Sequence, residues 1–173
     1  MHTNRKRVIY KGRILTFVEN AVNVNGKELL LNQVEHPGAA AAVPVMPDGR
    51  IILIRQFRYA INDWLWEIPA GLLEPGEQPD SCASREVGEE VGWTVSKLES
   101  LGSIVTSPGF SNQRIFLFVA HLQTQVSHVR EPGVVMTVHM KDWSEIEQIL
   151  GRNELIDAKT LVALYRYGAM RKG

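Results

Sequence analysis

The chain has 173 residues, 45% of them hydrophobic and 22% charged, and its 19 basic and 19 acidic side chains give a formal net charge of zero. This composition is typical of a folded globular protein and excludes a disordered chain, which would have fewer apolar residues and a larger net charge. The balanced charge also excludes a nucleic-acid partner that is bound through a broad basic surface. The length fits one domain, with or without a small appendage.

Cysteine usage and apolar patterning predict the environment of the protein. Cys82 is the single cysteine and cannot form an intramolecular disulfide, which favours a reducing compartment. The basic N-terminus is followed by alternating apolar and polar residues, whereas a signal peptide has a continuous apolar stretch. No run of about 18 apolar residues is present. We therefore expect a cytoplasmic protein with no membrane partner.

Residues 1–36 predict a small β unit. The residues of 7–18 follow a period of two, which is typical of half-buried strands. Asn25-Gly26 then separates two apolar runs and predicts a hairpin with a type I′ turn, because that turn needs positive φ at both central residues. Pro37-Gly38 ends this segment. We therefore expect an N-terminal β segment over 1–36 and a main domain over 37–173.

The remainder of the chain mixes strands and helices without a regular alternation. The expected elements, in chain order, are a hairpin with Asp48-Gly49 at its turn, a strand, a helix, two further strands and two helices. They cover residues 39–57, 64–68, 79–91, 95–105, 115–122, 144–150 and 157–170. This order predicts an α+β fold rather than a doubly wound parallel sheet.

Local signals mark the ends of the two longer helices. Pro79 suits the first turn of one helix, where no N–H is needed, and Gly92 suits the left-handed position after its last turn. Asp157 is expected to cap the last helix. The side chains expected on one apolar face of that helix are Leu161, Leu164 and Tyr165.

The helix over 79–91 carries a row of carboxylates. Glu86, Glu89 and Glu90 share one face by the i, i+3 and i, i+4 rule, and like charges at this spacing destabilise a helix by a few tenths of a kcal/mol per pair. Arg85 can offset one of them, and Glu77 adds another carboxylate nearby. A hard divalent cation resolves the repulsion, because Mg²⁺ prefers oxygen ligands and leaves positions for phosphate oxygens and water. A solvated acidic face is the alternative interpretation.

The spacing around this helix resembles the Nudix box. That motif reads Gly, five residues, Glu, seven residues, Arg-Glu, an aliphatic residue, one residue, Glu-Glu, one residue, Gly and an apolar residue. The matching positions are Gly71, Glu77, Arg85, Glu86, Val87, Glu89, Glu90, Gly92 and Trp93. The flanking segments 36–40, 55–59, 66–71 and 107–110 are similar to the ADP-ribose and nucleoside-diphosphate-sugar pyrophosphatase branch of the Nudix hydrolases.

This resemblance implies a fold and an activity. The fold would be a mixed-sheet α/β/α sandwich. The N-terminal β segment would be exchanged across a homodimer, and the alternative is that it extends the sheet of its own subunit. The activity would be hydrolysis of the pyrophosphate bond of a nucleoside diphosphate sugar, with Mg²⁺ as cofactor and Mn²⁺ as a substitute. The products would be a nucleoside monophosphate and a sugar phosphate.

The resemblance also implies roles for individual residues. The metal ligands would be the Ala70 carbonyl, Glu86 and Glu90, with Glu77 and Glu89 in support and Arg85 orienting the glutamates. The residues implied in substrate binding are Arg58, Arg55, Phe110 and Gln113.

The general base in this branch is usually a glutamate on a late loop, and Glu131 is the only acid between Ala120 and Lys141. The alternative is that Glu131 is only a turn residue before Pro132. Gln113 stands where related proteins often have a glutamate. Trp64 and Trp66 could stack on a base, or pack in the core or at a dimer interface.

Two other functions stay open on the sequence alone. One is a Nudix pyrophosphatase for another nucleotide class, such as dinucleoside polyphosphates, coenzyme A or modified nucleoside triphosphates. The other is a non-catalytic sensor of nucleotide sugars. Sensors built on this fold often have damaged boxes and an added DNA-binding domain, whereas the box in this chain is complete and we expect no second domain.

Overall fold

The computed structural model describes residues 3–127, 135–152, 154 and 156–171. The chain divides into two compact units. The first comprises Met1–Gly38 and Val105–Arg114, and the second comprises Ala39–Ile104 and Ile115–Gly173.

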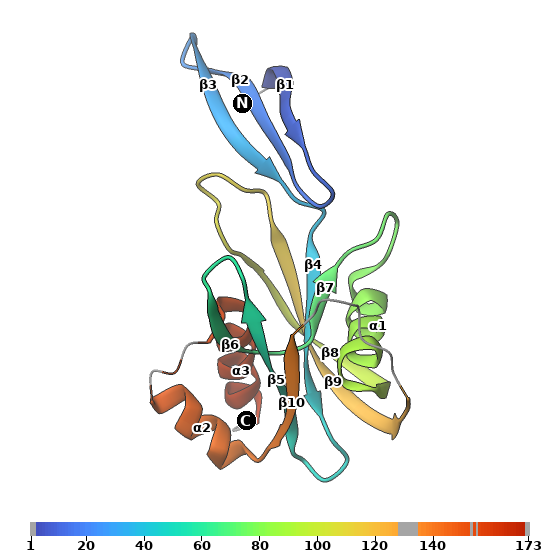
Figure 1. Ribbon diagram of the computed structural model, residues 1–173. Helices are drawn as coiled ribbons and strands as arrows, with labels where there is room; N and C mark the ends of the chain where they lie inside the picture. The colour runs from blue at the N-terminus through green and yellow to red at the C-terminus, as the bar shows by residue number, and fades with distance from the viewer. Residues whose placement is uncertain (1–2, 128–134, 153, 155, 172–173) are drawn as a thin grey trace. The chain divides into compact units, whose positions relative to one another are not determined.

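The first unit is built on a three-stranded antiparallel sheet in the order β1-β2-β3 (Figure 1). Its strands are β1 (Thr3–Lys11), β2 (Thr16–Val24) and β3 (Lys27–Glu35). Asn25 and Gly26 have φ values of 54° and 81° between β2 and β3. Both central residues therefore have the positive φ of a type I′ turn, and the predicted hairpin is confirmed.

The second unit contains a seven-stranded mixed sheet with the path β10-β5-β4-β9-β8, in which β6 also pairs with β5 and β7 with β4. Its strands are β4 (Ala39–Val45), β5 (Ile51–Arg58), β6 (Asp63–Glu67), β7 (Ala70–Leu72), β8 (Trp93–Val105), β9 (Arg114–Gln125) and β10 (Met136–Lys141). β4 and β9 are parallel, whereas β5 is antiparallel to β4, β6 and β10.

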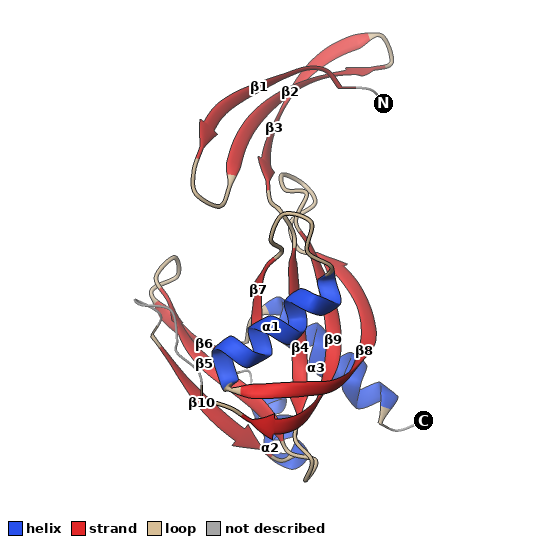
Figure 2. Cartoon of the chain, turned by 90° about the vertical axis from the view of Figure 1, so that its right-hand side faces the viewer, coloured by secondary structure: helices blue, strands red, loops and turns tan. Residues whose placement is uncertain are grey.

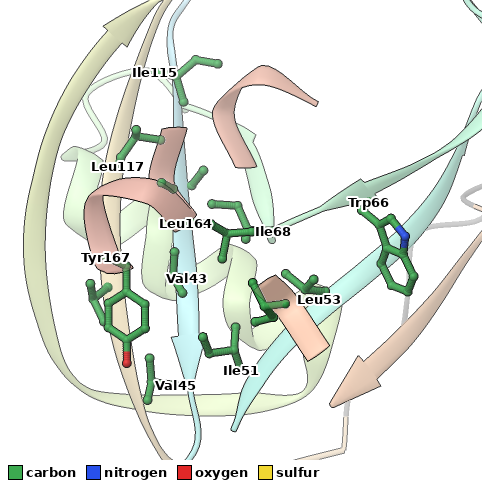
Figure 3. Packing of buried hydrophobic residues seen from close by; sticks show 14 of the residues in the cluster. Val43, Val45, Ile51, Leu53, Trp66, Ile68, Ile115, Leu117, Leu164 and Tyr167 are labelled. Carbon is green, nitrogen blue, oxygen red and sulfur yellow. The ribbon is translucent and has the colours of Figure 1, made fainter. Parts of the chain in front are cut away.

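Helices cover both faces of this sheet, which gives the α/β/α sandwich (Figure 2). The helices are α1 (Pro79–Val91), α2 (Trp143–Gly151) and α3 (Ala158–Met170). Alternate residues of β4 and β5 face opposite sides. Leu53 belongs to the core under α2 and α3 (Figure 3), whereas Ile52 and Ile54 belong to the core under α1. The predicted α+β class is confirmed.

The ends of α1 agree with the prediction, but the buried face of α3 does not. Asp157 caps α3 as expected, because its side chain accepts a hydrogen bond from the Lys159 backbone N–H at 3.0 Å. Tyr165, however, is 60% exposed. The buried face follows Thr160, Ala163, Leu164 and Tyr167. Apolar residues occur in both phases of this helix, so the pattern alone did not separate the two faces.

Two strands were not predicted. β7 is only three residues long and follows Pro69 directly, so Pro69 and Gly71 looked like an interruption. β10 pairs along β5 from Met136 opposite Gln56 to Lys141 opposite Ile51. In addition, α2 extends through Gly151 rather than ending before it. Among the described residues, no helix is long and apolar enough to span a membrane.

The contact between α2 and α3 gives a stability prediction. A Cβ at Gly168 would lie 2.7 Å from Cζ2 of the Trp143 ring. Gly168→Ala is therefore expected to lower the free energy of unfolding by about 1–3 kcal/mol, because the ring or the helix must shift. Gly151→Ala is the matched control, since nothing lies within 4 Å of the added Cβ. Urea unfolding of both variants tests this, and equal stabilities would contradict it.

Candidate active site

The packing of α1 determines where its carboxylates lie. The helix has Pro79 in its first turn and ends at Gly92, whose φ is 73° and whose N–H donates to the Gly88 carbonyl at 3.1 Å. Its buried residues are Cys82, Ala83, Val87 and Val91. They hold α1 against the face that includes β4 and β7 (Figure 2). The carboxylates beside this stripe are therefore brought to the backbone of β7.

Glu86 and Glu90 both contact β7. An oxygen of Glu90 accepts a hydrogen bond from the Ala70 N–H at 3.0 Å. The carboxylate of Glu86 occupies the space beside Gly71, where an added Cβ would overlap it. The glycine at the first position of the box is therefore required by the close approach of Glu86 to the backbone.

Arg85 connects the helix, the preceding loop and β7. Its Nε donates to Glu77 at 2.9 Å, and its Nη1 donates to Glu86 at 2.5 Å and to Glu89 at 3.1 Å. Its Nη2 donates to the Leu72 carbonyl at 3.2 Å. The hydrogen bonds from Arg85 hold the pKa of Glu77 down at about 2. Arg85 therefore holds the side chains of Glu77, Glu86 and Glu89 close together.

The carboxylates of α1 differ in exposure. Glu89 is 54% exposed, whereas Glu86 is 12% exposed. Burial raises the pKa of Glu90 to about 7 and also raises the pKa of Glu86 above its usual range. Two carboxylates that are held out of water in this way favour a nearby positive charge. Of the three glutamates on the expected face, Glu86 and Glu90 are thus partly buried, whereas Glu89 is exposed.

The donors suit Mg²⁺ in part. Among residues 3–127, 135–152, 154 and 156–171, no three His, Cys, Asp or Glu side chains are arranged as a ready cation cage. Arg85 already donates hydrogen bonds to Glu77 and to one oxygen of Glu86. Mg²⁺ is commonly held by one or two carboxylates while several waters stay bound. Glu86 and Glu90 are two carboxylates that both contact β7, so the residues present are compatible with such a cation while Glu77 stays bound to Arg85.

A second group of charges surrounds Glu67, at the end of β6. Arg58 donates to it from Nε at 2.5 Å and from Nη2 at 2.6 Å, and Lys159 donates from Nζ at 2.6 Å. Burial raises the pKa of Glu67, but the hydrogen bonds from Arg58 and the charge of Lys159 outweigh this effect and leave the pKa below its usual value. The sequence pattern indicates Arg58 as a site residue but does not indicate Glu67 or Lys159, which lie 92 residues apart.

The other residues implied in substrate binding have varied surroundings. Arg55 is exposed on β5 and lies over the Trp66 ring, 5.4 Å from its centroid. Trp66 itself is 7% exposed and donates to Glu154 at 2.6 Å, so it packs in the core. Trp64 makes an edge contact with Phe57, with 5.7 Å between ring centroids.

Phe110 and Gln113 belong to the first compact unit. Phe110 is 59% exposed, and its carbonyl accepts a hydrogen bond from the Val34 N–H at 2.7 Å. The Gln113 side chain accepts from the Thr106 hydroxyl at 2.7 Å and lies 3.1 Å from Nε2 of His36. Glu131 lies outside the described residues.

Known proteins resemble this chain over most of its length. The family model of the NUDIX domain matches residues 35–164. An ADP-ribose pyrophosphatase from Bacillus subtilis is 36% identical over 168 residues, which cover 94% of this chain and 89% of that protein. An ADP-ribose pyrophosphatase from Mycobacterium tuberculosis is 35% identical over 177 residues, which cover 99% of this chain and 84% of that protein.

Two further matches broaden the comparison. A methanol dehydrogenase activator from Bacillus methanolicus is 31% identical over 166 residues, which cover 94% of this chain and 89% of that protein. The crystal structure of an ADP compounds hydrolase superimposes with a TM-score of 0.83 over 99% of this chain and 94% of the other. Its sequence identity is 22%, so this likeness shows the fold alone.

Proposed function

Because this chain belongs to the Nudix hydrolase family, we propose that it hydrolyses the pyrophosphate bond of ADP-ribose or another nucleoside diphosphate sugar. The products are a nucleoside monophosphate and a sugar phosphate. The observation that carries this proposal is the pair Glu86 and Glu90, two desolvated carboxylates that lie against the backbone of β7. Two relatives named ADP-ribose pyrophosphatases, each aligned over at least 94% of the chain, support this class of substrate.

Mg²⁺ is the cofactor that we propose, with Mn²⁺ as a substitute. Glu86, Glu90 and the Ala70 carbonyl would hold it, and Glu77 and Glu89 would support this set through their shared partner Arg85. When bound, the cation lowers the pKa of a water and neutralises charge on the substrate phosphates. Arg85 itself is occupied by carboxylates, which suits a residue that orients ligands rather than one that binds substrate.

The remaining roles concern substrate binding and proton transfer. Arg58 and Arg55 are proposed to bind the anionic substrate, since a guanidinium fits phosphate oxygens with two hydrogen bonds. Phe110 and Gln113 are proposed to contact the nucleoside or sugar. Glu131 is proposed as the general base that accepts a proton from the attacking water. Phosphoryl transfer depends mainly on positioning and charge stabilisation, which these groups supply.

A substrate panel tests the proposed function. The protein is incubated with Mg²⁺ and with ADP-ribose, other nucleoside diphosphate sugars, dinucleoside polyphosphates, coenzyme A and nucleoside triphosphates, and the products are identified. We expect the highest kcat/KM with a nucleoside diphosphate sugar and release of the nucleoside monophosphate. A higher value with another class would assign a different Nudix substrate. Ligand binding without any turnover would favour a sensor.

The contact between Gly71 and Glu86 provides a prediction for the site. In Gly71→Ala the new methyl group displaces the Glu86 carboxylate, which can move because it is the end of a flexible side chain. We expect the fold to persist and kcat/KM to fall by about 10- to 100-fold, the range for lost support of a metal ligand. Gly88→Ala on α1 is the control, because the nearest atom is 3.9 Å from its added Cβ. Wild-type activity in Gly71→Ala would argue against Glu86 as a ligand.

We also propose that the protein is a homodimer that forms through its N-terminal sheet. Several large apolar side chains on β1 and β3 are 45–67% exposed in the single chain. They are Val8, Ile9, Tyr10, Leu29, Leu30 and Leu31. Clusters of exposed apolar residues of this kind mark interaction surfaces. Light scattering coupled to gel filtration should give twice the monomer mass, and Leu30→Lys should shift the mass towards the monomer. A wild-type monomer would reject this assembly.

A further inference from the structure

Net stabilisation of the fold does not by itself account for the buried ion cluster around Glu67. The side chain of Glu67 is 1% exposed and that of Lys159 is 10% exposed. Removing such charges from water costs free energy, and apolar residues of similar volume often serve a fold equally well or better. A buried ion pair is therefore weak evidence for a stabilising role. What the cluster does provide is a defined orientation for the third member, Arg58.

Glu67 binds one edge of the Arg58 guanidinium, and no other side chain that the structure describes binds the opposite edge. Both carboxylate oxygens accept from Arg58, one from Nε at 2.5 Å and the other from Nη2 at 2.6 Å. A guanidinium has five N–H groups, so Glu67 uses two and leaves three, two on Nη1 and one on Nη2. The Arg58 side chain is 43% exposed, whereas its partner is fully buried. Glu67 thus holds the inner edge of Arg58 and directs its outer edge away from the core.

The Arg58 side chain leaves β5 on the face of the sheet that packs against α1. Residues 54 and 58 are both even-numbered positions of β5, so their side chains leave the same face of the strand. Ile54 belongs to the core under α1, and α1 carries Glu90. The hydrogen bonds to Glu67 raise the pKa of Arg58, and the negative charges of Glu90 and Asp157 raise it to smaller extents. Arg58 is thus a partly exposed cation on the same face of the sheet as the helix that carries Glu86 and Glu90.

The first turn of α3 holds Glu67 in place. Lys159 bonds both Glu67, at 2.6 Å, and Asp157, at 3.0 Å. The Thr160 hydroxyl accepts the Ile68 N–H at 2.8 Å, and the Asp157 N–H donates to the Trp66 carbonyl at 3.3 Å. These contacts clamp both the backbone and the carboxylate around position 67. The orientation of Arg58 consequently depends on a helix that is distant in the sequence.

We propose that Glu67 is a positioning residue that directs the free edge of Arg58 towards the phosphate groups of the substrate, and that Lys159 holds Glu67 for this task. The inference rests on the proposed function, because it takes Arg58 as a ligand of the nucleoside diphosphate sugar. It adds two residues, Glu67 and Lys159, that act on substrate affinity without touching the substrate.

A double-mutant cycle separates positioning from general support of the fold. Kinetics with ADP-ribose and saturating Mg²⁺ are measured for Glu67→Gln, Arg58→Met and the double variant, each checked for folding by circular dichroism. We expect Glu67→Gln to raise KM about 10- to 100-fold, the value of a charge-assisted hydrogen bond, with a much smaller change in kcat. In the Arg58→Met background the same substitution should leave KM almost unchanged. Equal effects in both backgrounds would overturn the inference.

Lys159 variants supply a second line of evidence if Glu67→Gln does not fold. Lys159→Met should raise KM, and Lys159→Arg should restore it, because the guanidinium can again bond Glu67. The effect of Lys159→Met should also disappear in the Arg58→Met background. Lys97→Met is the matched control, since Lys97 is 66% exposed and pairs with Glu99 at the surface. A rise in KM with Lys159→Arg as large as with Lys159→Met would contradict positioning.

Binding measurements distinguish failure of this inference from failure of the proposed function. Titration calorimetry of ADP-ribose is performed on the same variants. A wild type that binds ADP-ribose but does not hydrolyse it would reject the proposed function alone, and the cycle on affinity would still decide the role of Glu67. A wild type that neither binds nor hydrolyses ADP-ribose or another nucleoside diphosphate sugar would overturn both.

Discussion

Replacing either buried carboxylate of α1 by its amide, in Glu86→Gln or Glu90→Gln, is expected to lower turnover at saturating substrate by at least about 100-fold. Loss of a supporting group around a metal ligand commonly costs 10- to 100-fold, so loss of a ligand itself should cost more. The amide keeps the shape of the side chain but removes the negative charge that a hard cation requires. Steady-state assays over a range of Mg²⁺ concentrations measure both the rate and the apparent metal affinity.

The fold should survive these two substitutions. At pH 8 the buried Glu90 of the metal-free protein must carry its charge although burial has raised its pKa to about 7. The neutral amide avoids this cost, so metal-free Glu90→Gln should be no less stable than wild type. Asp80→Asn is a suitable control on the same helix, because Asp80 is an exposed acid of its first turn. If circular dichroism showed that the glutamine variants are unfolded, or if their turnover were near normal, a mainly catalytic role of Glu86 and Glu90 would be contradicted.

The parts of the fold that were predictable depend on local chemistry. α1 was delimited correctly because Pro79 and Gly92 mark its two ends within one short stretch of sequence. The turn at Asn25-Gly26 is equally local, since two adjacent residues must both adopt positive φ. The proximity of Glu86 and Glu90 follows from the helical repeat alone. These features need no information about distant residues.

The parts that were not predictable depend on contacts between distant segments. Glu67 occupies the polar phase of the alternating run that includes Trp66 and Ile68, and its role becomes evident only when Lys159 of α3 is placed beside it. The division of the acidic face into buried Glu86 and exposed Glu89 depends on how α1 packs against β7, and the helical repeat does not contain that information. The buried face of α3 was assigned wrongly for the same reason, because Tyr165 and Tyr167 both offer an apolar ring.

Removal of the Glu67 carboxylate is expected to have the largest effect on stability. Glu67→Ala should lower the free energy of unfolding at pH 7 by about 3 kcal/mol, because Lys159 keeps a charge in a buried position without its main partner. This expected loss lies at the low end of the roughly 3–5 kcal/mol that is typical when one partner of a buried ion pair is removed. The reason is that the Arg58 side chain is 43% exposed and can become hydrated. Glu99→Ala is the control, because Glu99 pairs with Lys97 at the surface and should matter far less.

The difference between Glu67→Ala and wild type should depend on pH in a defined direction. Burial raises the pKa of Glu67, but Arg58 and Lys159 lower it by a larger amount. The folded-state pKa therefore lies below the unfolded value of 4.5. The unfolded chain therefore binds more protons as the pH falls below 4.5, and wild type loses the contribution of the ion cluster there. Urea unfolding at pH 7 and below the folded-state pKa should show the two proteins converging in acid. A constant difference across this range would mean that the lost stability comes from side-chain packing rather than from charge.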